Sequence, residues 1–346
     1  MKIQKLKSTD GFISWDLDGA ERAVGIVRSA PKILQGGAEM LARSVTYSFA
    51  AFGLPISGAS VGVNAKPEDR PGALASFVDE VLPMVETGQL TLDPGRGVDE
   101  AALSTLRQKE HRAVPLHTVR AGVSLADHLV AIGAAAAAGV AVDGLADKTV
   151  AIEGFGPVGV ALARRVGELG GRVVAISTGA GSAIGAPLGF APADLAAAWE
   201  AHGERAISQL LADEKPAWAV FGVNCDVLFV GSKAGALTHE GAEHVKAKAV
   251  VPIGPTPVTP RAMAMLSRAG SVYLPDFLTI AGPLLAGEAP PGSTEEWVVD
   301  GVQSSIVDAV VDAARHPEGP FLGACQRAED FLRTWRDALP FGRPTG

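Results

Sequence analysis

The sequence predicts an α/β protein of two domains, the second built on a doubly wound, mostly parallel sheet. Three observations lead to this class. Short apolar runs alternate with helical patterns between residues 147 and 274, glycine-rich turns separate them, and 346 residues suffice for two cores. We place an N-terminal α/β substrate and oligomerisation domain at 1–130, a nucleotide-binding domain at 131–290, and C-terminal helices that fold back on the first domain at 291–346.

The elements follow in order along the chain. In the first domain, Arg22–Val27 and Ser60–Val63 are the expected strands, with a helix over Ala38–Phe52 between them. A small-residue helix over Leu125–Gly139 leads into the second domain. Further on, we expect strands at 149–152, 172–176, 227–230, 249–252 and 272–274, and helices from 157, over 192–202, over 260–269, and over 295–337.

The stretch 147–178, DKTVAIEGFGPVGVALARRVGELGGRVVAIST, contains a strand, a glycine turn, a helix and a second strand. Such a GxGxxG turn gives a tight bend, a close backbone approach to a pyrophosphate, and close packing of helix on strand. The exposed N–H groups of the helix N-terminus favour the phosphates. This order predicts a dinucleotide site, with a purely structural glycine turn as the alternative. The expected cofactor-binding residues are Gly154, Phe155, Gly156, Pro157, Val158, Gly159, Ser177, Thr178 and Gly231.

The choice of cofactor depends on the residues that end the second strand. An acidic residue there binds the ribose 2′-hydroxyl and repels a 2′-phosphate. This chain has Ser177, Thr178 and Gly179 instead, and no arginine or lysine in 177–190. The neutral hydroxyls tolerate a phosphate, so the sequence slightly favours NADP(H) over NAD(H).

Composition excludes several other classes. The net charge of −8 and the absence of a basic run argue against nucleic acid as a partner. Two cysteines fit a reducing cytoplasm, and the N-terminus lacks the apolar core of a signal peptide. The longest apolar stretch, 129–142, is short and rich in alanine and glycine, which predicts a buried helix and no membrane span. His239 and His244 lack an acidic partner, so we expect no metal site.

Four segments together resemble the glutamate/leucine/phenylalanine/valine dehydrogenase superfamily. They are LARSVTYSFAAFGLPISGAS at 41–60, DKTVAIEGFGPVG at 147–159, CDVLFVGSKAGALT at 225–238, and the stretch from AKAVVPIGPTPVTPRAMAML to YLPDFLTIAGPLL at 247–285. The resemblance covers about residues 15–300. It implies two domains with a cleft between them, NAD(P) on the second, a small-molecule substrate, and a homodimer or higher homo-oligomer.

The resemblance also implies a site that this chain has altered. The two lysines that family members use for the substrate carboxylate and for water or ammonia fall on Ser48 and Ser60. Serine has no permanent charge, so it cannot replace the electrostatic effect of an ammonium. The proton-shuttling aspartate falls on Pro94, with Asp93 adjacent, and Ser124 replaces a threonine. The expected catalytic residues are Asp93, Ser60 and Ser48, and the expected substrate-binding residues are Ser48, Ser124 and Lys66.

Two kinds of function remain open at this point. The first is an NAD(P)-dependent oxidoreductase whose substrate is an imine, amine, carbonyl or hydroxy compound rather than a simple α-amino acid. A pocket lined by hydroxyls and lacking cations would favour a less charged substrate. The second is a non-catalytic or regulatory homologue that binds a nucleotide. A further alternative is an ordinary amino-acid dehydrogenase whose catalytic groups have moved to other residues.

Overall fold

The computed structural model describes residues 1–120, 122–185, 188–210 and 212–344, and its contacts divide the chain into two compact units. Unit 1 comprises Met1–Arg112 and Cys325–Gly346, and unit 2 comprises Ala113–Ala324. The division falls earlier than the boundary predicted at residue 130. The C-terminal helices were predicted to pack on the first domain from residue 291. By its contacts, however, the segment 291–324 belongs to unit 2, and only the chain from Cys325 onward belongs to unit 1.

Unit 1 contains one five-stranded sheet in the order β1-β2-β4-β3-β5. Strands β1 and β2 run antiparallel to their neighbours, whereas β4, β3 and β5 are parallel. The elements are β1 (Lys2–Lys5), β2 (Gly11–Trp15), β3 (Ala23–Ala30), α1 (Gln35–Ala51), β4 (Ser57–Asn64), α2 (Arg70–Glu86), β5 (Leu90–Pro94), η1 (Glu100–Leu103) and α3 (Ser104–Arg107), while α12 (Pro320–Leu332) crosses the division.

A helix covers each face of this sheet. The apolar side chains of α2, such as Phe77 and Val81, share one buried cluster with Val27 of β3 and Val61 of β4. Helix α1 packs on β4 from the other side. The approach is close at Gly58, where an added Cβ would lie 1.9 Å from the carbonyl oxygen of Ala42. The two predicted strands and the predicted helix of this segment are therefore present, each with shifted ends.

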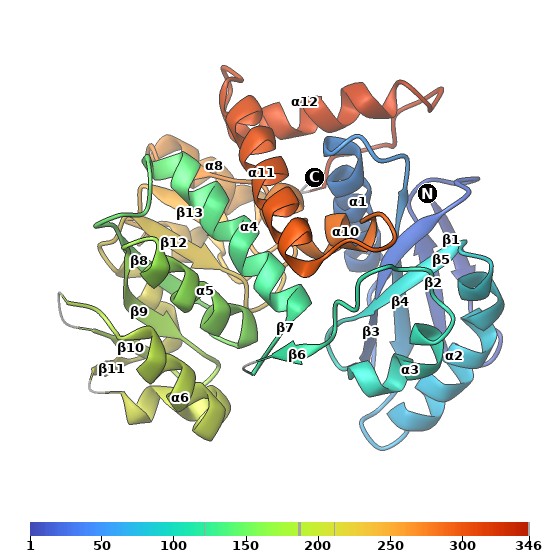
Figure 1. Cartoon of the computed structure of the whole chain (residues 1–346), viewed down its shortest axis with the longest axis horizontal. Coiled ribbons are helices and arrows are strands. Elements are labelled where there is room, and N and C mark those ends of the chain that lie inside the picture. Colours follow the sequence, from blue (N-terminus) through green and yellow to red (C-terminus); the bar gives the residue numbers. More distant parts are fainter. Residues whose placement is uncertain (121, 186–187, 211, 345–346) are drawn as a thin grey trace. The chain divides into compact units, whose positions relative to one another are not determined.

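Unit 2 contains a seven-stranded sheet and a two-stranded β6–β7 ribbon (Figure 1). Its elements are β6 (Val119–Arg120), β7 (Val123–Ser124), α4 (Leu125–Val142), β8 (Thr149–Glu153), α5 (Pro157–Glu168), β9 (Arg172–Ser177), β10 (Ser182–Ile184), α6 (Pro192–His202), η2 (Gly203–Gln209), β11 (Asp213–Lys215), η3 (Ala217–Gly222), β12 (Val227–Val230), α7 (His239–Ala242), β13 (Ala249–Pro252), α8 (Pro260–Arg268), β14 (Val272–Tyr273), α9 (Asp276–Thr279), α10 (Gly282–Gly287) and α11 (Glu295–Ala314).

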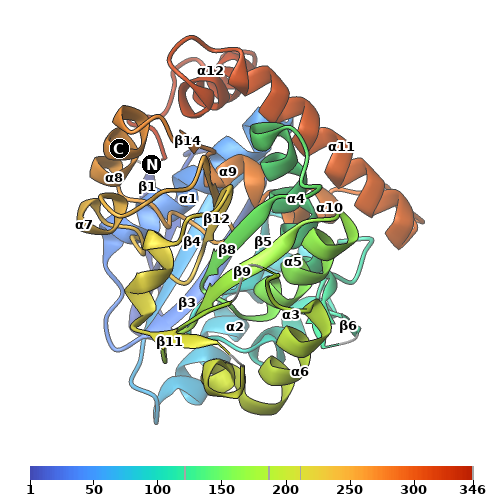
Figure 2. The same ribbon diagram turned by 90° about the vertical axis from the view of Figure 1, so that its left-hand side faces the viewer.

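The strand order β11-β10-β9-β8-β12-β13-β14 makes this sheet doubly wound. Five neighbouring strands are parallel, in the order β9, β8, β12, β13 and β14. Strands β10 and β11 add an antiparallel edge next to β9. Figure 2 shows α7 and α8 on one side of the sheet and α4 and α5 on the other. The order reverses between β8 and β12, and ligands of such sheets bind where the strand order reverses, beyond the carboxyl ends. The predicted fold class is confirmed.

Helix α4 is long and apolar enough to cross a membrane by length and composition alone, with half of it buried. Within unit 2 it lies between α5 and α11 and also contacts α10 and β13 (Figure 1). Its alanines at 131, 134, 135, 137 and 138 are completely buried and permit this close packing. The helix therefore serves as the apolar centre of a helical layer, which matches the buried helix expected from the sequence.

Candidate functional site

The glycine turn after β8 has three glycines with three different roles. Gly154 has a φ of +83°, and a Cβ there would lie 2.4 Å from the amide nitrogen of Ser232. A Cβ on Gly159 would meet the Phe155 ring at 2.8 Å. A Cβ on Gly156 would come no closer than 3.8 Å to any described neighbour, the Trp199 ring. The protein thus requires the first and third glycines for its own packing, whereas the space beside Gly156 is open.

Glu153, the last residue of β8, links the glycine turn to the loop after β12. Its Oε2 accepts hydrogen bonds from the amides of Gly231 at 3.1 Å and Ser232 at 3.2 Å. A Cβ on Gly231 would clash with the backbone amide of Gly254 at 2.8 Å. Gly231, predicted to bind cofactor, therefore lies at the carboxyl edge beside β8, but its own lack of a side chain serves the packing of two loops.

At the end of β9, the backbone carbonyl of Ser177 and the hydroxyl of Thr178 are engaged by the protein. The carbonyl oxygen of Ser177 accepts from the amides of Gly154 and Phe155, at 3.1 and 2.7 Å. The hydroxyl of Thr178 donates to the carbonyl oxygen of Glu204 at 2.6 Å. This bond draws η2 toward the end of β9. As a result, Oε2 of Glu204 lies 2.8 Å from the position of a Cβ on Gly179.

In unit 1, two of the predicted catalytic residues share one row across the sheet. The register pairs Ser14 of β2 with Ser60, Ser60 with Ile26 of β3, and Ile26 with Asp93 of β5. Paired residues project to the same face of a sheet. Ser60 and Asp93 are therefore on one face, with Ile26 between them. Ser60 is completely buried, and its Oγ accepts a hydrogen bond from Nη2 of Arg28 at 3.3 Å.

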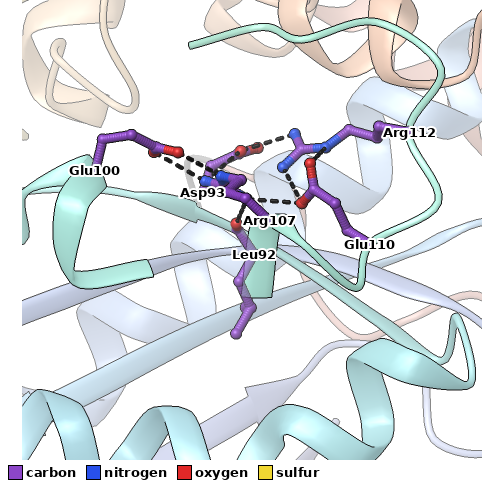
Figure 3. Close-up of polar contacts among 6 residues, drawn as sticks. All are labelled: Leu92, Asp93, Glu100, Arg107, Glu110 and Arg112. Carbon is purple, nitrogen blue, oxygen red and sulfur yellow. Dashed lines mark hydrogen bonds and ion pairs between the residues drawn. The ribbon is translucent and has the colours of Figure 1, made fainter. Parts of the chain in front are cut away.

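Asp93 belongs to a cluster of alternating charges at the end of β5 (Figure 3). Its Oδ1 lies 2.7 Å from Nη1 of Arg112 and 3.5 Å from Nη2 of Arg107. Glu110 bridges the same two arginines, and Glu100 pairs with Arg107. Burial alone lowers the pKa of Arg112, but attraction by Asp93 and Glu110 is stronger and raises it. Asp93 is thus a structural ion-pair partner in this arrangement, and its predicted role in proton transfer stays a prediction.

The remaining predicted residues belong to different elements. Ser48 is buried in α1, Lys66 is exposed in the turn after β4, and Ser124 caps α4 in unit 2. The Ser124 hydroxyl accepts from the amide of Asp127 at 3.0 Å and donates to its carboxylate at 2.7 Å. These roles in substrate binding stay predictions. No group of three metal-binding side chains occurs in the part of the chain that the structure describes.

Two charged residues of these sites, Arg28 and Glu204, were not predicted from the sequence. Arg28 lies one residue beyond the strand predicted at Arg22–Val27, because β3 continues to Ala30. The only signal in the sequence for a functional role of Arg28 was its position as a charged residue directly after the apolar run that ends at Val27. Glu204 reaches Gly179 from a different element, so no local pattern indicated it.

Known proteins resemble this chain in sequence and in fold. The family model described as glutamate/leucine/phenylalanine/valine dehydrogenase matches residues 127–300, which is half of the chain. Glutamate dehydrogenase from Thermotoga maritima is 35% identical over 173 residues, 49% of this chain but only 40% of that enzyme. Glutamate dehydrogenase from Aeropyrum pernix is 25% identical over 302 residues, 82% of this chain and 70% of that one.

The fold extends the likeness beyond the segment that the family model matches. The hetero-hexameric glutamate dehydrogenase of Thermus thermophilus, solved with leucine bound, superposes with a TM-score of 0.78 at 24% identity, covering 95% of this chain and 86% of that one. At this identity the likeness shows the fold alone. Together with the family match, it confirms the predicted resemblance: the chain belongs to the glutamate/leucine/phenylalanine/valine dehydrogenase family.

Proposed function

We propose that the protein is a nicotinamide-dependent oxidoreductase that acts on an imine, amine, carbonyl or hydroxy compound rather than on a simple α-amino acid. The observation that carries this proposal is the open space at Gly156, at the carboxyl edge of the sheet where the strand order reverses. Gly156 has a negative φ of −153°, so a positive φ does not require a glycine there, and we attribute its lack of a side chain to a ligand.

The residues present fit a dinucleotide. The N-terminus of α5 begins at Pro157, and its first N–H groups point toward the carboxyl edge of the sheet, where they suit a pyrophosphate. The nicotinamide ring, when bound, supplies the hydride chemistry. The protein then has to hold the cofactor and present the substrate carbon to it.

For the cofactor, Glu204 supports NAD(H) in preference to NADP(H). A carboxylate beside Gly179, next to the end of β9, lies where an acid would accept a hydrogen bond from the ribose 2′-hydroxyl and repel a 2′-phosphate. The sequence slightly favoured NADP(H) because no acid follows β9 directly. The acid in the structure comes from η2 instead, held there by the bond of Thr178 to the Glu204 carbonyl.

The substrate part of the proposal rests on the two serines that the family resemblance places at lysine positions. Ser48 and Ser60 are both buried, at 3% and 0% exposure. Neither can offer an ammonium to a substrate carboxylate or to an attacking water, and Asp93 is already paired with two arginines. An α-amino acid held in the manner of the family is therefore a poor candidate.

The proposal also covers the oligomeric state of the protein and its location in the cell. The Thermus relative is described as a hetero-hexamer. We propose a homo-oligomer for this chain, formed in a reducing cytoplasm where Cys225 and Cys325 stay buried thiols. Light scattering coupled to gel filtration measures the assembly, and a monomeric mass would contradict it.

Titration of the protein with NADH, followed by fluorescence, tests the cofactor site. Turnover is then followed by absorbance with 2-oxo acids, ketones and imines, against glutamate and leucine as comparison substrates. Turnover of a carbonyl or imine without oxidation of the amino acids supports the proposal. NADH binding without any turnover would favour the non-catalytic alternative, and no binding of NADH or NADPH would overturn the proposal.

A further inference from the structure

Arg28 occupies an unusual place for a charged side chain, on a strand with parallel neighbours on both sides. Along β3, residues 26, 28 and 30 are half-buried while 27 and 29 are buried, so one face of the strand is partly open. Arg28 projects from this open face. Its Nη2 donates to Oγ of Ser60 at 3.3 Å, and its Nε is buried without a protein partner.

Two other arginines of unit 1 show what Arg28 lacks. Arg43 donates to Asp16 at 2.7 Å, and Arg112 lies at the same distance from Asp93. Among the residues that the structure describes, Arg28 has no such carboxylate, and burial alone lowers its pKa. A guanidinium taken out of water without an anion carries an uncompensated cost. An anion that is absent from the protein itself would offset that cost.

A second buried polar group is present in the same row. Ser14 is directly opposite Ser60 in the antiparallel register of β2 and β4, so both hydroxyls are on the face that carries Arg28. Ser14 is completely buried, and its Oγ has no hydrogen-bond partner. Ser60 accepts from Arg28, which leaves the hydrogen of its own hydroxyl available to donate. Unused donors therefore come from β2, β3 and β4.

We propose that Arg28, supported by the hydroxyls of Ser60 and Ser14, binds an anionic group of the substrate, a carboxylate. This inference rests on the proposed function and narrows it to carbonyl or hydroxy compounds that carry an acid group. It also changes the expectation of a pocket without cations, because the Arg28 guanidinium contacts Ser60, the serine at a position where family members have a lysine. A guanidinium offers a planar pair of donors that matches the two oxygens of a carboxylate.

The test measures binding of small anions to the full-length protein by calorimetry. Malonate is the carboxylate probe, malonamide is its neutral counterpart, and inorganic phosphate is the alternative anion. We expect malonate to bind more tightly than phosphate and malonamide not to bind. In Arg28→Gln, malonate should bind about tenfold more weakly or worse, since a hydrogen bond to a charged group is lost. Ser14→Ala and Ser60→Ala should each weaken binding several-fold.

Arg96→Gln is the matched control, because Arg96 is exposed in the loop after β5 and its loss changes the net charge equally. It should leave malonate binding unchanged. If circular dichroism shows Arg28→Gln to be unfolded, Arg28→Lys is measured instead, and it should bind malonate several-fold more weakly because the paired donors are lost. Equal malonate binding in wild type and in the Arg28 variant would overturn the inference, as would equal binding of malonamide.

NADH affinity is measured on the same samples to separate this inference from the proposed function. Loss of malonate binding in Arg28→Gln with unchanged NADH affinity supports the anion site. Malonate binding that depends on Arg28, in a protein with no affinity for either nucleotide, would keep the anion site and overturn the oxidoreductase. Phosphate binding more tightly than malonate would contradict the carboxylate assignment.

Discussion

Asp93 and Arg112 form an ion pair of 2.7 Å at the end of β5, and Arg107 approaches the same oxygen to 3.5 Å. The side chains are 18% and 4% exposed, so the pair is largely shielded from water. We expect Asp93→Asn to reduce the free energy of unfolding by about 2 kcal/mol, because it leaves Arg112 partly buried with one acidic partner fewer.

Urea denaturation measures this loss, with the exposed Asp99→Asn as a control that should stay within about 0.5 kcal/mol of wild type. NADH affinity should be the same in all three proteins. A fully stable Asp93→Asn that loses turnover would instead assign Asp93 to proton transfer.

Restoring a lysine at Ser60 should be unfavourable in this chain. The position is completely buried, and Arg28 already lies 3.3 Å from the serine oxygen, so Ser60→Lys brings two cations together. We expect a loss of about 1–3 kcal/mol in the free energy of unfolding. The double variant Ser60→Lys, Arg28→Ser should recover part of that loss because it holds one cation again. Denaturation of the four proteins in a double-mutant cycle measures the coupling, and purely additive effects would contradict it.

The sequence predicted unit 2 better than unit 1, for a physical reason. Strands β12 and β13 are buried on both faces, so they appear as continuous apolar runs, and both were predicted with the observed bounds, Val227–Val230 and Ala249–Pro252. Strand β3 has one open face, and Arg28 on it made the strand look as if it ended at Val27. The N-terminal strands β1 and β2 pair antiparallel at the sheet edge and were not predicted.

The candidate sites likewise differ in how far they could be predicted from the sequence. The glycine turn is local, so its residues could be identified from 147–178 alone. The environment of Asp93 could not, because Arg107 and Arg112 reach it from beyond the end of β5. Glu204 could not be predicted either, because it lies far from β9 in the sequence and its position depends on how η2 packs against the end of β9.

Glu204→Gln should shift cofactor preference toward NADPH. The carboxylate beside Gly179 repels a 2′-phosphate and attracts a 2′-hydroxyl, so removing its charge should raise the ratio of NADPH to NADH affinity by roughly three- to tenfold. Fluorescence titrations with both nucleotides measure the ratio. Glu200→Gln, the same change of charge at an exposed position of α6, should leave the ratio as it is in wild type. A parallel shift in both variants would indicate a general effect of charge.

His128 should make unit 2 less stable in mild acid. Burial lowers the pKa of His128 from its ordinary 6.5, although Glu168 and Glu295 oppose the effect. The folded protein therefore favours the neutral ring, while the unfolded chain takes up a proton as the pH falls through about 6.5. Stability is unaffected above that pH and decreases below it, until the pH reaches the lower pKa of the folded state.

His128→Gln should abolish this part of the pH dependence. Because the ring is only half-buried, we expect a difference below about 1 kcal/mol between pH 7.5 and pH 5. Urea denaturation of wild type and variant at both pH values measures it. A variant that loses as much stability on acidification as wild type would show that other groups account for the change.

Gly154 and Gly156 should respond in opposite ways to the same substitution. Gly154→Ala places a side chain at a φ of +83° and 2.4 Å from the Ser232 amide, so the free energy of unfolding should fall by about 2 kcal/mol or more. Gly156→Ala meets no described atom within 3.8 Å and keeps an extended backbone, so it should fold with the stability of wild type. It should nevertheless bind NADH at least about tenfold more weakly, because the methyl group occupies the space of the pyrophosphate. Denaturation and NADH titration of both variants separate packing from binding, since a glycine turn kept only for packing would leave NADH affinity intact in Gly156→Ala.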